Sequence, residues 1–231
     1  MTEPAAATPT PTVTPAVEAT GLTVRRDGVV VLDGLDLAVR PGELVAVTGP
    51  SLSGKTTLVE LLAGWSRPDA GTVRWDGSTT PPPWSHLGVV PQGFALLEEL
   101  TVLENIDLAG RFDHADRHDG HRRDGRPDHP DRDEWRDHLL ERLGLDHLRH
   151  RGAFEVSVGE RQRTMVARAL AGRPAVVLAD EPVAHQDDRH AGVVLDLLRA
   201  AATDGAAVVV ASRSPLAADR TVELGPSDVP G

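Results

Sequence analysis

A glycine-rich loop between an apolar run and a segment of helical composition constrains this chain more than any other feature. Residues 49–57 read Gly-Pro-Ser-Leu-Ser-Gly-Lys-Thr-Thr, which satisfies the pattern G-x-x-x-x-G-K-[ST]. In such a loop the backbone N–H groups surround phosphates, Lys55 reaches the β- and γ-phosphate oxygens, and the Thr56 hydroxyl ligates Mg²⁺. A nucleoside triphosphate is therefore the expected ligand.

The segments on either side of the loop support this interpretation. Residues 44–47 predict a buried strand before the loop, and residues 56–62 predict a helix whose N-terminus faces the phosphates. A chance match in a glycine-rich loop is the alternative, and the strand-loop-helix order argues against it. The residues expected to bind the nucleotide are Gly49, Pro50, Ser51, Leu52, Ser53, Gly54, Lys55, Thr56 and Thr57.

Two carboxylates follow an apolar run later in the chain. Residues 176–179 predict a buried strand that ends in Asp180 and Glu181. In a fold of this kind Asp180 would lie beside Thr56 and hold Mg²⁺, directly or through water, and Glu181 would orient or deprotonate an attacking water. The alternative is an acidic strand-to-loop turn without function, and the phosphate loop upstream makes that alternative the weaker one.

The composition excludes several function classes. A net charge of −11 over 231 residues argues against nucleic acid as the main partner, because phosphate backbones require a basic face. The absence of cysteine excludes disulfides and thiolate chemistry and suits the cytoplasm. No run approaches the roughly 18 apolar residues of a membrane span, and the N-terminus lacks a signal-peptide pattern. Any action at a membrane is therefore expected to go through a partner.

Strand-like and helix-like segments alternate along the chain, which predicts an α/β fold with a mainly parallel sheet covered on both faces. Residues 1–18, rich in Ala, Pro and Thr, are expected to form a disordered tail. The expected strands lie near residues 35–39, 44–47, 72–75, 89–90, 175–179 and 206–211. The expected helices lie near residues 56–62, from about 101, and at 135–143, 160–171 and 191–202.

A segment dense in His, Asp and Arg interrupts this alternation at about residues 112–134. His114, His118 and His121 have spacings that would allow three imidazoles on a helix to bind a metal. Two glycines and two prolines in the segment act against a helix, and its alternating charges solvate well. A surface insertion is the favoured interpretation, and the metal site is the alternative.

The phosphate loop and the two carboxylates, with the residues between them, resemble the ATP-binding subunit of ABC transporters, and the resemblance covers about residues 19–225. Three further motifs match that family. Gln92 stands at the place of the glutamine in the Q-loop of that family. Residues 156–160, Val-Ser-Val-Gly-Glu, match the LSGGQ signature, and Asp187 matches the D-loop aspartate. The stretches 94–97 and 100–105 are most similar to the ATPases of lipoprotein and macrolide exporters.

The resemblance implies a P-loop NTPase core with a mainly parallel sheet, an antiparallel β subdomain, and a helical subdomain at about 93–172 that carries the signature. An ABC-type ATP-binding domain would then span residues 19–231. The resemblance also implies an ATPase with Mg²⁺ as cofactor. The metal would be held by Thr56, Gln92 and Asp180, and the catalytic residues would be Glu181, Gln92 and Lys55.

The partners follow from the same resemblance. The signature residues would contact the γ-phosphate bound to an opposite subunit, in a head-to-tail homodimer or in a heterodimer with a second ATPase subunit. A transmembrane permease would hold this cytoplasmic subunit at the inner face of the cell membrane. The signature residues are Ser157, Val158, Gly159 and Glu160.

The departures from the family pattern cluster at the nucleotide. Leu52 stands where the family has glycine. A residue with a Cβ restricts the backbone conformations that the loop can adopt. Val158 replaces the first signature glycine with a stiff, bulky residue. Arg213 stands in place of the switch histidine; it cannot exchange a proton near neutral pH but can hold a γ-phosphate tightly. Because the chain has no tyrosine to stack on adenine, Arg25 or Arg26 is the expected substitute.

Two functions from different classes fit these observations. The first is the ATP-binding subunit of a transporter, with hydrolysis weakened by Val158 and Arg213. The second is a regulatory or structural ATP-binding module with little or no steady turnover. A soluble P-loop kinase or DNA-repair ATPase is disfavoured by the signature region and by the lack of a long coiled-coil insertion.

Overall fold

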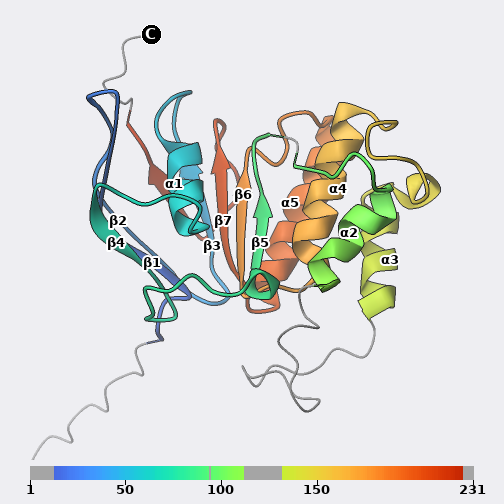
Figure 1. The fold of residues 1–231 in the computed structure, drawn as a ribbon, viewed down its shortest axis with the longest axis horizontal. Helices are drawn as coiled ribbons and strands as arrows, with labels where there is room; N and C mark the ends of the chain where they lie inside the picture. Colours follow the sequence, from blue (N-terminus) through green and yellow to red (C-terminus); the bar gives the residue numbers. More distant parts are fainter. Residues whose placement is uncertain (1–12, 94, 112–131, 226–231) are drawn as a thin grey trace, which may run out of the picture.

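A five-stranded parallel sheet forms the centre of the molecule in the computed structural model, which describes residues 13–93, 95–111 and 132–225 (Figure 1). The strand order is β5-β6-β7-β3-β8, and every neighbouring pair is parallel. The strands are β3 (Leu44–Thr48), β5 (Leu87–Val90), β6 (Val176–Asp180), β7 (Ala207–Ser212) and β8 (Arg220–Glu223). Ligands bind at the carboxyl ends of such strands, which is where β3 leads into the phosphate loop and β6 into the two carboxylates.

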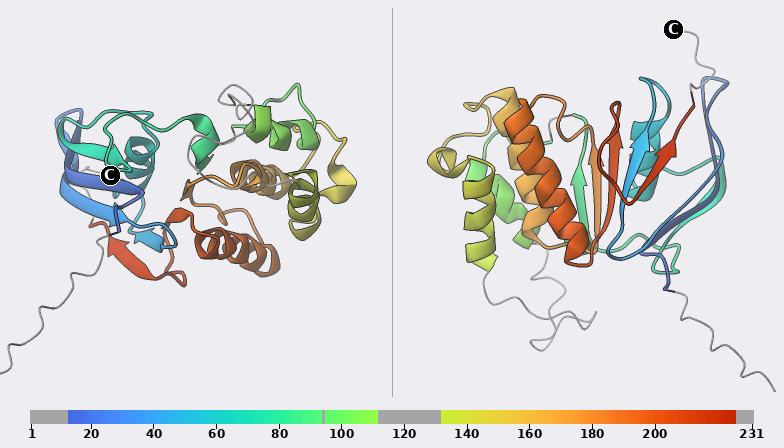
Figure 2. Two further views of the ribbon diagram at one scale, coloured as in Figure 1. Left: turned by 90° about the horizontal axis from the view of Figure 1, so that it is seen from below. Right: turned by 180° about the vertical axis from the view of Figure 1, so that it is seen from behind.

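A second, antiparallel sheet has the order β2-β1-β4. Its strands are β1 (Val17–Arg26), β2 (Val29–Val39) and β4 (Ala70–Trp75). Helix α1 (Lys55–Leu62) lies between this sheet and the parallel sheet (Figure 1, Figure 2). Buried side chains from both sheets and from α1 form one hydrophobic core, which includes Val24, Leu61 and Val209. The phosphate loop is thereby anchored between two sheets.

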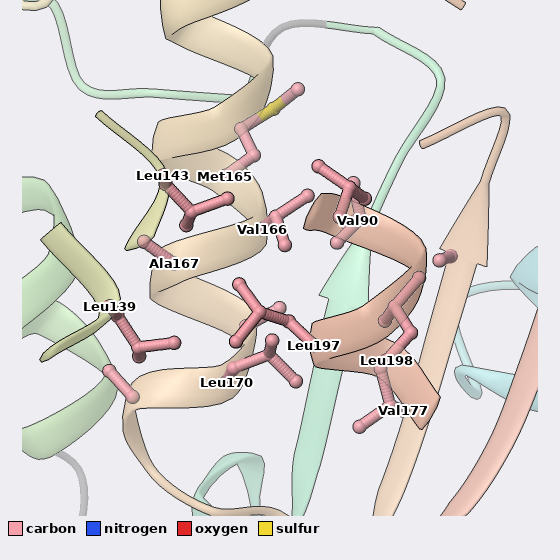
Figure 3. Packing of buried hydrophobic residues seen from close by; sticks show 14 of the residues in the cluster. Val90, Leu139, Leu143, Met165, Val166, Ala167, Leu170, Val177, Leu197 and Leu198 are labelled. Atoms are coloured by element: carbon pink, nitrogen blue, oxygen red, sulfur yellow. The ribbon is translucent and has the colours of Figure 1, made fainter. Parts of the chain in front are cut away.

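The remaining helices cover the other side of the parallel sheet (Figure 2). They are α2 (Val102–Arg111), α3 (Arg132–Arg142), α4 (Val158–Ala171) and α5 (Asp188–Thr203), with short 3-10 turns at Trp84–His86 and Asp146–Leu148. Their apolar faces form a second core with the strands, in which Leu170 of α4, Leu198 of α5 and Val177 of β6 pack together (Figure 3). Alternate residues of β6 face the two cores, as the period of a strand requires.

The predicted α/β class, with a mainly parallel sheet, an antiparallel sheet and helices, is confirmed. Helices α2, α3 and α4 fall within the range 93–172 that was expected to be helical. The boundary of the expected tail was wrong by two residues, because β1 begins at Val17. Val17 is fully buried and pairs with Val39 on one side and Trp75 on the other. Residues 1–12 lie outside the described part of the chain.

The expected insertion also ends earlier than predicted, because α3 begins at Arg132 and includes residues 133 and 134. Its first turn is acidic, and Arg136 pairs with Asp133 one turn earlier, which favours helix at this end. The rest of the insertion, with His114, His118 and His121, lies outside the described residues. Strand β8 was not predicted, because its four residues are mostly exposed and carry no apolar run.

Candidate nucleotide-binding site

The loop at residues 49–54 connects the end of β3 to the first turn of α1. Gly54 precedes the helix with φ 91°, and a Cβ there would lie 2.9 Å from the backbone oxygen of Val31. Only glycine fits this position without a shift of the neighbouring strand. Leu52 also has a left-handed backbone, with φ 67°, and its side chain is 67 % exposed. Such a conformation costs a leucine roughly 1–2 kcal/mol relative to glycine.

Lys55 is the first residue of α1 and is almost fully buried. Its Nζ donates hydrogen bonds to the backbone oxygens of Gly49, at 2.8 Å, and Pro50, at 2.7 Å. The loop therefore curls around the ammonium group. This placement puts one positive charge at the centre of the loop and at the N-terminus of a helix, where the backbone already favours anions.

Three oxygen-bearing side chains converge beside the lysine. The Thr56 hydroxyl donates to Asp180 Oδ2 at 2.6 Å, and the same hydroxyl oxygen lies 3.2 Å from Gln92 Oε1. A hydroxyl has one proton, so two acceptors share a single donor here. The group is rich in oxygen acceptors and poor in donors, which suits a hard divalent cation such as Mg²⁺.

The surroundings of Asp180 show whether these side chains fit Mg²⁺. The carboxylate is 1 % exposed, and its Oδ1 has no hydrogen-bond partner among the described residues. Burial raises the pKa of Asp180 above its ordinary value; the Thr56 hydrogen bond opposes this effect and the neighbouring Glu181 reinforces it. A buried carboxylate oxygen without a partner costs free energy that a bound cation would recover. The side chains at this place therefore fit Mg²⁺.

Glu181 follows at the turn after β6 and is nearly buried. Its Oε1 lies 3.3 Å from Nε of Arg213, whose side chain is largely exposed. Arg213 therefore faces the carboxylate predicted to activate water, although the sequence suggested a contact with phosphate. A guanidinium, unlike an imidazole, has no proton that it can give up near neutral pH, so Arg213 contributes a fixed positive charge at this position.

A cavity of about 460 Å³ joins these groups. The predicted residues Ser51, Leu52, Gly54, Lys55, Thr56, Thr57, Gln92, Asp180, Glu181 and Arg213 all line it. Four further lining residues were not predicted: Val31, Gln162, Ala184 and His185. The described lining includes Val31 of β2 but neither Arg25 nor Arg26, which lie at the exposed end of β1, and their stacking on adenine stays a prediction.

The signature segment lies elsewhere on the surface. Ser157 caps α4 and exchanges hydrogen bonds with Glu160, which forms a capping box, and Val158 is 44 % exposed. A Cβ on Gly159 would lie 2.9 Å from the backbone oxygen of His185, so this glycine allows close packing. None of the described residues 157–160 lines the cavity.

Asp187 begins α5. Its side chain accepts a hydrogen bond from the backbone N–H of His190 and also contacts the imidazole at 2.8 Å. These contacts, first the backbone hydrogen bond of His190, lower the pKa of Asp187 below its ordinary value. The structure thus shows a helix cap at this position, and the role expected for Asp187 remains a prediction.

In residues 13–93, 95–111 and 132–225 there is no group of three or more His, Cys, Asp or Glu side chains placed to hold a metal by themselves. Over the same ranges, no helix has the length and hydropathy needed to cross a bilayer.

Comparisons with known proteins agree on one family. A family model described as ABC transporter matches residues 32–184. The lipoprotein-releasing system ATP-binding protein LolD of Anaeromyxobacter dehalogenans is 38% identical over 229 residues, which cover 91% of this chain and 89% of the relative. LolD of Chromohalobacter salexigens is 37% identical over 221 residues, 88% of each chain.

Other relatives are longer than this chain. An ABC transporter ATP-binding protein of Mycobacterium tuberculosis is 37% identical over 211 residues, and the match spans 60% of its length. Among solved structures, the dimeric structure of a bacterial ABC transporter cassette superposes with a TM-score of 0.77 at 25% identity, covering 91% of this chain and 94% of the other. A post-hydrolysis state of the same cassette, bound to ADP and Pi, gives 0.73 at 27% identity, covering 86% of this chain and 88% of the other.

Proposed function

This chain belongs to the ABC transporter ATP-binding family, and from that premise we propose that it is the ATPase subunit of a transporter, coupling ATP binding and hydrolysis to a membrane permease. One observation carries the proposal: Thr56 Oγ1 and Asp180 Oδ2 lie 2.6 Å apart. This contact joins the phosphate loop to the carboxylates after β6 within a single cavity. Loop, carboxylates and cavity together are the parts that phosphoryl transfer to water requires.

Mg²⁺ is the proposed cofactor, held by Thr56, Gln92 and Asp180. When bound beside nucleotide phosphates, the ion neutralises charge that develops during phosphoryl transfer. The support comes from the three clustered oxygen-bearing side chains and from the buried Oδ1 of Asp180. The loop residues Gly49 to Thr57 would hold the phosphates through backbone N–H groups, and Lys55 through its charge.

Glu181 is the proposed general base, because its carboxylate faces the cavity next to Asp180. Gln92 would orient the attacking water as well as the metal. Arg213 already pairs with Glu181, so the base has to give up that ion pair or share it when water approaches. The guanidinium competes with an attacking water for the carboxylate oxygens, which supports hydrolysis that is slower than the fold allows.

A second subunit completes the proposed site. Ser157 and Val158 are exposed at the start of α4, Gly159 and Glu160 are partly exposed, and none of the four lines the cavity of their own chain. In a head-to-tail pair they would close on the nucleotide bound by the opposite phosphate loop, as a homodimer or with a different ATPase subunit. A related cassette with 25% identity has been solved as a dimer, which supports a paired state. Asp187 would lie near the same interface.

The proposed permease site is an apolar cleft of about 210 Å³ beside β5. Its lining includes two exposed tryptophans, Trp65 and Trp84, whose rings lie 6.3 Å apart, and Pro91. Pro91 is covalently joined to Gln92, which lines the nucleotide cavity. A permease segment in this cleft would therefore touch the residue next to the proposed metal ligand. Binding there would place this subunit at the inner face of the cell membrane.

A regulatory or structural ATP-binding module is the second candidate. One observation favours it, namely the Arg213–Glu181 ion pair. The pair occupies the carboxylate that would activate water, and it does not prevent ATP binding.

Phosphate release separates the two candidates. The chain should be assayed with MgATP alone and with its cognate permease in lipid, in parallel with Glu181→Gln. An ATPase subunit shows turnover that the substitution lowers by roughly 10²–10⁴ while ATP binding persists. Equal rates in the parent and in Glu181→Gln would show that Glu181 takes no part in hydrolysis. ATP binding without turnover in either condition would favour the regulatory module.

A further inference from the structure

The backbone of Glu181 adopts a conformation that a glutamate rarely takes. Its φ is 49°, in the left-handed region. For a non-glycine residue this costs on the order of 1 kcal/mol and persists only where surrounding contacts hold it. The turn at this residue ends β6 and directs the side chain into the cavity that Lys55, Thr56 and Asp180 also line. Whatever stabilises the turn therefore also aims the carboxylate.

Three hydrogen bonds hold the backbone of Glu181. Its N–H donates to the backbone oxygen of Ala211 at 2.9 Å, which ties the residue to β7. Its oxygen accepts from the backbone N–H of Ala184 at 3.1 Å and from Nε2 of Gln162 at 2.6 Å. The Gln162 bond is the shortest of the three, and it alone comes from a side chain.

Gln162 lies on α4, just after the signature segment, and is 3 % exposed. Its Oε1 accepts a hydrogen bond from the backbone N–H of His185 at 3.2 Å, while its Nε2 donates to Glu181. The orientation of the amide is fixed by these partners, because a backbone oxygen only accepts and a backbone N–H only donates. One side chain thus closes both ends of the turn at residues 181–185. No other neutral side chain of this length carries a donor and an acceptor together.

We infer that Gln162 is a positioning residue for Glu181: it holds the left-handed turn that aims the carboxylate into the nucleotide cavity. The inference rests on the proposed function, since it assumes that Glu181 acts on water. It also links two parts of the molecule, because Gln162 belongs to the helix that begins with the signature segment. A shift of α4 would move the carbonyl of Glu181 directly, and a misplaced catalytic group loses rate steeply.

Gln162→Ala and Gln162→Glu test the inference. The alanine variant loses both contacts. The glutamate variant keeps an acceptor for His185 and, when its carboxyl is ionised, loses the donor to Glu181. Both should lower kcat at least about tenfold, with KM for MgATP within about twofold, because the carboxylate is misaimed while the phosphate loop is intact. A normal kcat in Gln162→Ala, which has neither donor nor acceptor, would overturn the inference.

Trp135→Phe is a matched control for stability. Trp135 Nε1 donates to the backbone oxygen of Leu170 at 3.0 Å, which is also a side-chain hydrogen bond to a backbone oxygen, at the far end of α4. This variant loses a comparable bond outside the cavity, so kcat should stay within about twofold of the parent. If it lowers kcat as much as Gln162→Ala does, general destabilisation explains both results and the inference fails.

A second readout does not depend on activity. In a Glu181→Gly background the left-handed turn has no steric cost, so Gln162→Ala should lower the melting temperature less than it does in the parent. Equal losses in the two backgrounds would contradict a role in holding the turn. Glu181→Gln separates the failure of this inference from failure of the proposed function. If Glu181→Gln abolishes turnover while both Gln162 variants keep the parental kcat, only the positioning role is wrong.

Discussion

Nε of Arg213 lies 3.3 Å from Oε1 of Glu181, so the carboxylate that faces the nucleotide cavity is paired with a permanent positive charge. The guanidinium is mostly exposed and the carboxylate is nearly buried. Because the carboxylate is shielded from solvent, dissolved salt weakens this ion pair less than it would weaken a pair of two fully exposed groups.

This relationship predicts that hydrolysis is limited by Arg213 together with Val158. Arg213→His combined with Val158→Gly should raise phosphate release by an order of magnitude or more, equivalent to at least about 1.4 kcal/mol of barrier. Histidine can exchange a proton near neutral pH, and glycine lets the signature backbone approach an opposite nucleotide. Arg213→Lys with Val158→Gly is the control, because it keeps the charge. A parent that already hydrolyses ATP briskly, with no gain in the double variant, would contradict this prediction.

Lys55→Ala should weaken ATP binding at least about tenfold, since a charge-assisted contact of this kind contributes roughly 1.5–3 kcal/mol. Calorimetry with MgATP measures the change. Arg74→Ala is a suitable control, because Arg74 also donates to a loop oxygen, that of Gly77, but does not line the cavity. Unchanged affinity in Lys55→Ala would contradict the proposal that this loop binds the phosphates of ATP.

Leu52→Gly should be more stable than Leu52→Ala by about 1 kcal/mol, because only glycine relieves the left-handed backbone with φ 67°. Both variants remove the exposed side chain, so the comparison isolates the backbone. Chemical denaturation of the two proteins gives the difference. If the alanine variant is the more stable, the loop is not strained at this position.

Asp219 should make stability depend on acid pH. The backbone N–H of Leu44 and the guanidinium of Arg199 hold the pKa of Asp219 below its ordinary value of 3.8. A lowered pKa in the folded state means stability that is present above the unfolded value and lost as pH falls through the folded value. The melting temperature of Asp219→Asn should therefore lie below that of the parent at pH 6, and the gap should close below about pH 4.

The exposed Asp196 on α5 gives the matched control for that experiment. Asp196→Asn should follow the parent at every pH. A gap between the parent and Asp219→Asn that stays constant into strong acid would show that the lost contact is not electrostatic.

Trp84→Ala should weaken association with the cognate permease, because it removes an exposed ring from the apolar cleft. Co-purification from membranes measures the loss, and Trp84→Phe should restore most of it by keeping an aromatic contact. The melting temperature of the isolated subunit checks that folding is intact. Full association of Trp84→Ala would move the permease site elsewhere on the surface.

The contact between Thr56 and Asp180 could be predicted because Asp180 ends one apolar run and Thr56 follows the loop that leaves another. Parallel strands end at one edge of a sheet, so strand ends that are distant in sequence meet there. The helices and most strands of the core were found for the same reason, since their buried residues recur at regular spacing. Strand β1 was missed, although its Val17, Leu22 and Val24 are buried in the core. Strand β8 carries no such pattern, because its residues are mostly exposed.

The roles of Gln162 and Arg213 depend on side-chain directions that spacing does not encode. Gln162 looks like an ordinary helical residue in the sequence, and only the fold shows that it reaches the carbonyl of Glu181. Arg213 was identified as the switch position, but its partner there was expected to be phosphate. The left-handed backbone of Glu181 also escaped prediction, because glutamate is not a residue that marks such turns.

The order of the parallel sheet has a consequence for how the molecule is made. β3, which leads into the phosphate loop, is hydrogen-bonded to β7 on one side and to β8 on the other, and both come from the last part of the chain. During synthesis β3 therefore leaves the ribosome long before either neighbour exists. Its apolar residues stay unpaired until β7 and β8 have been synthesised. A chain that stops short of β7 would keep two open strand edges at β3, which invite pairing with other nascent chains.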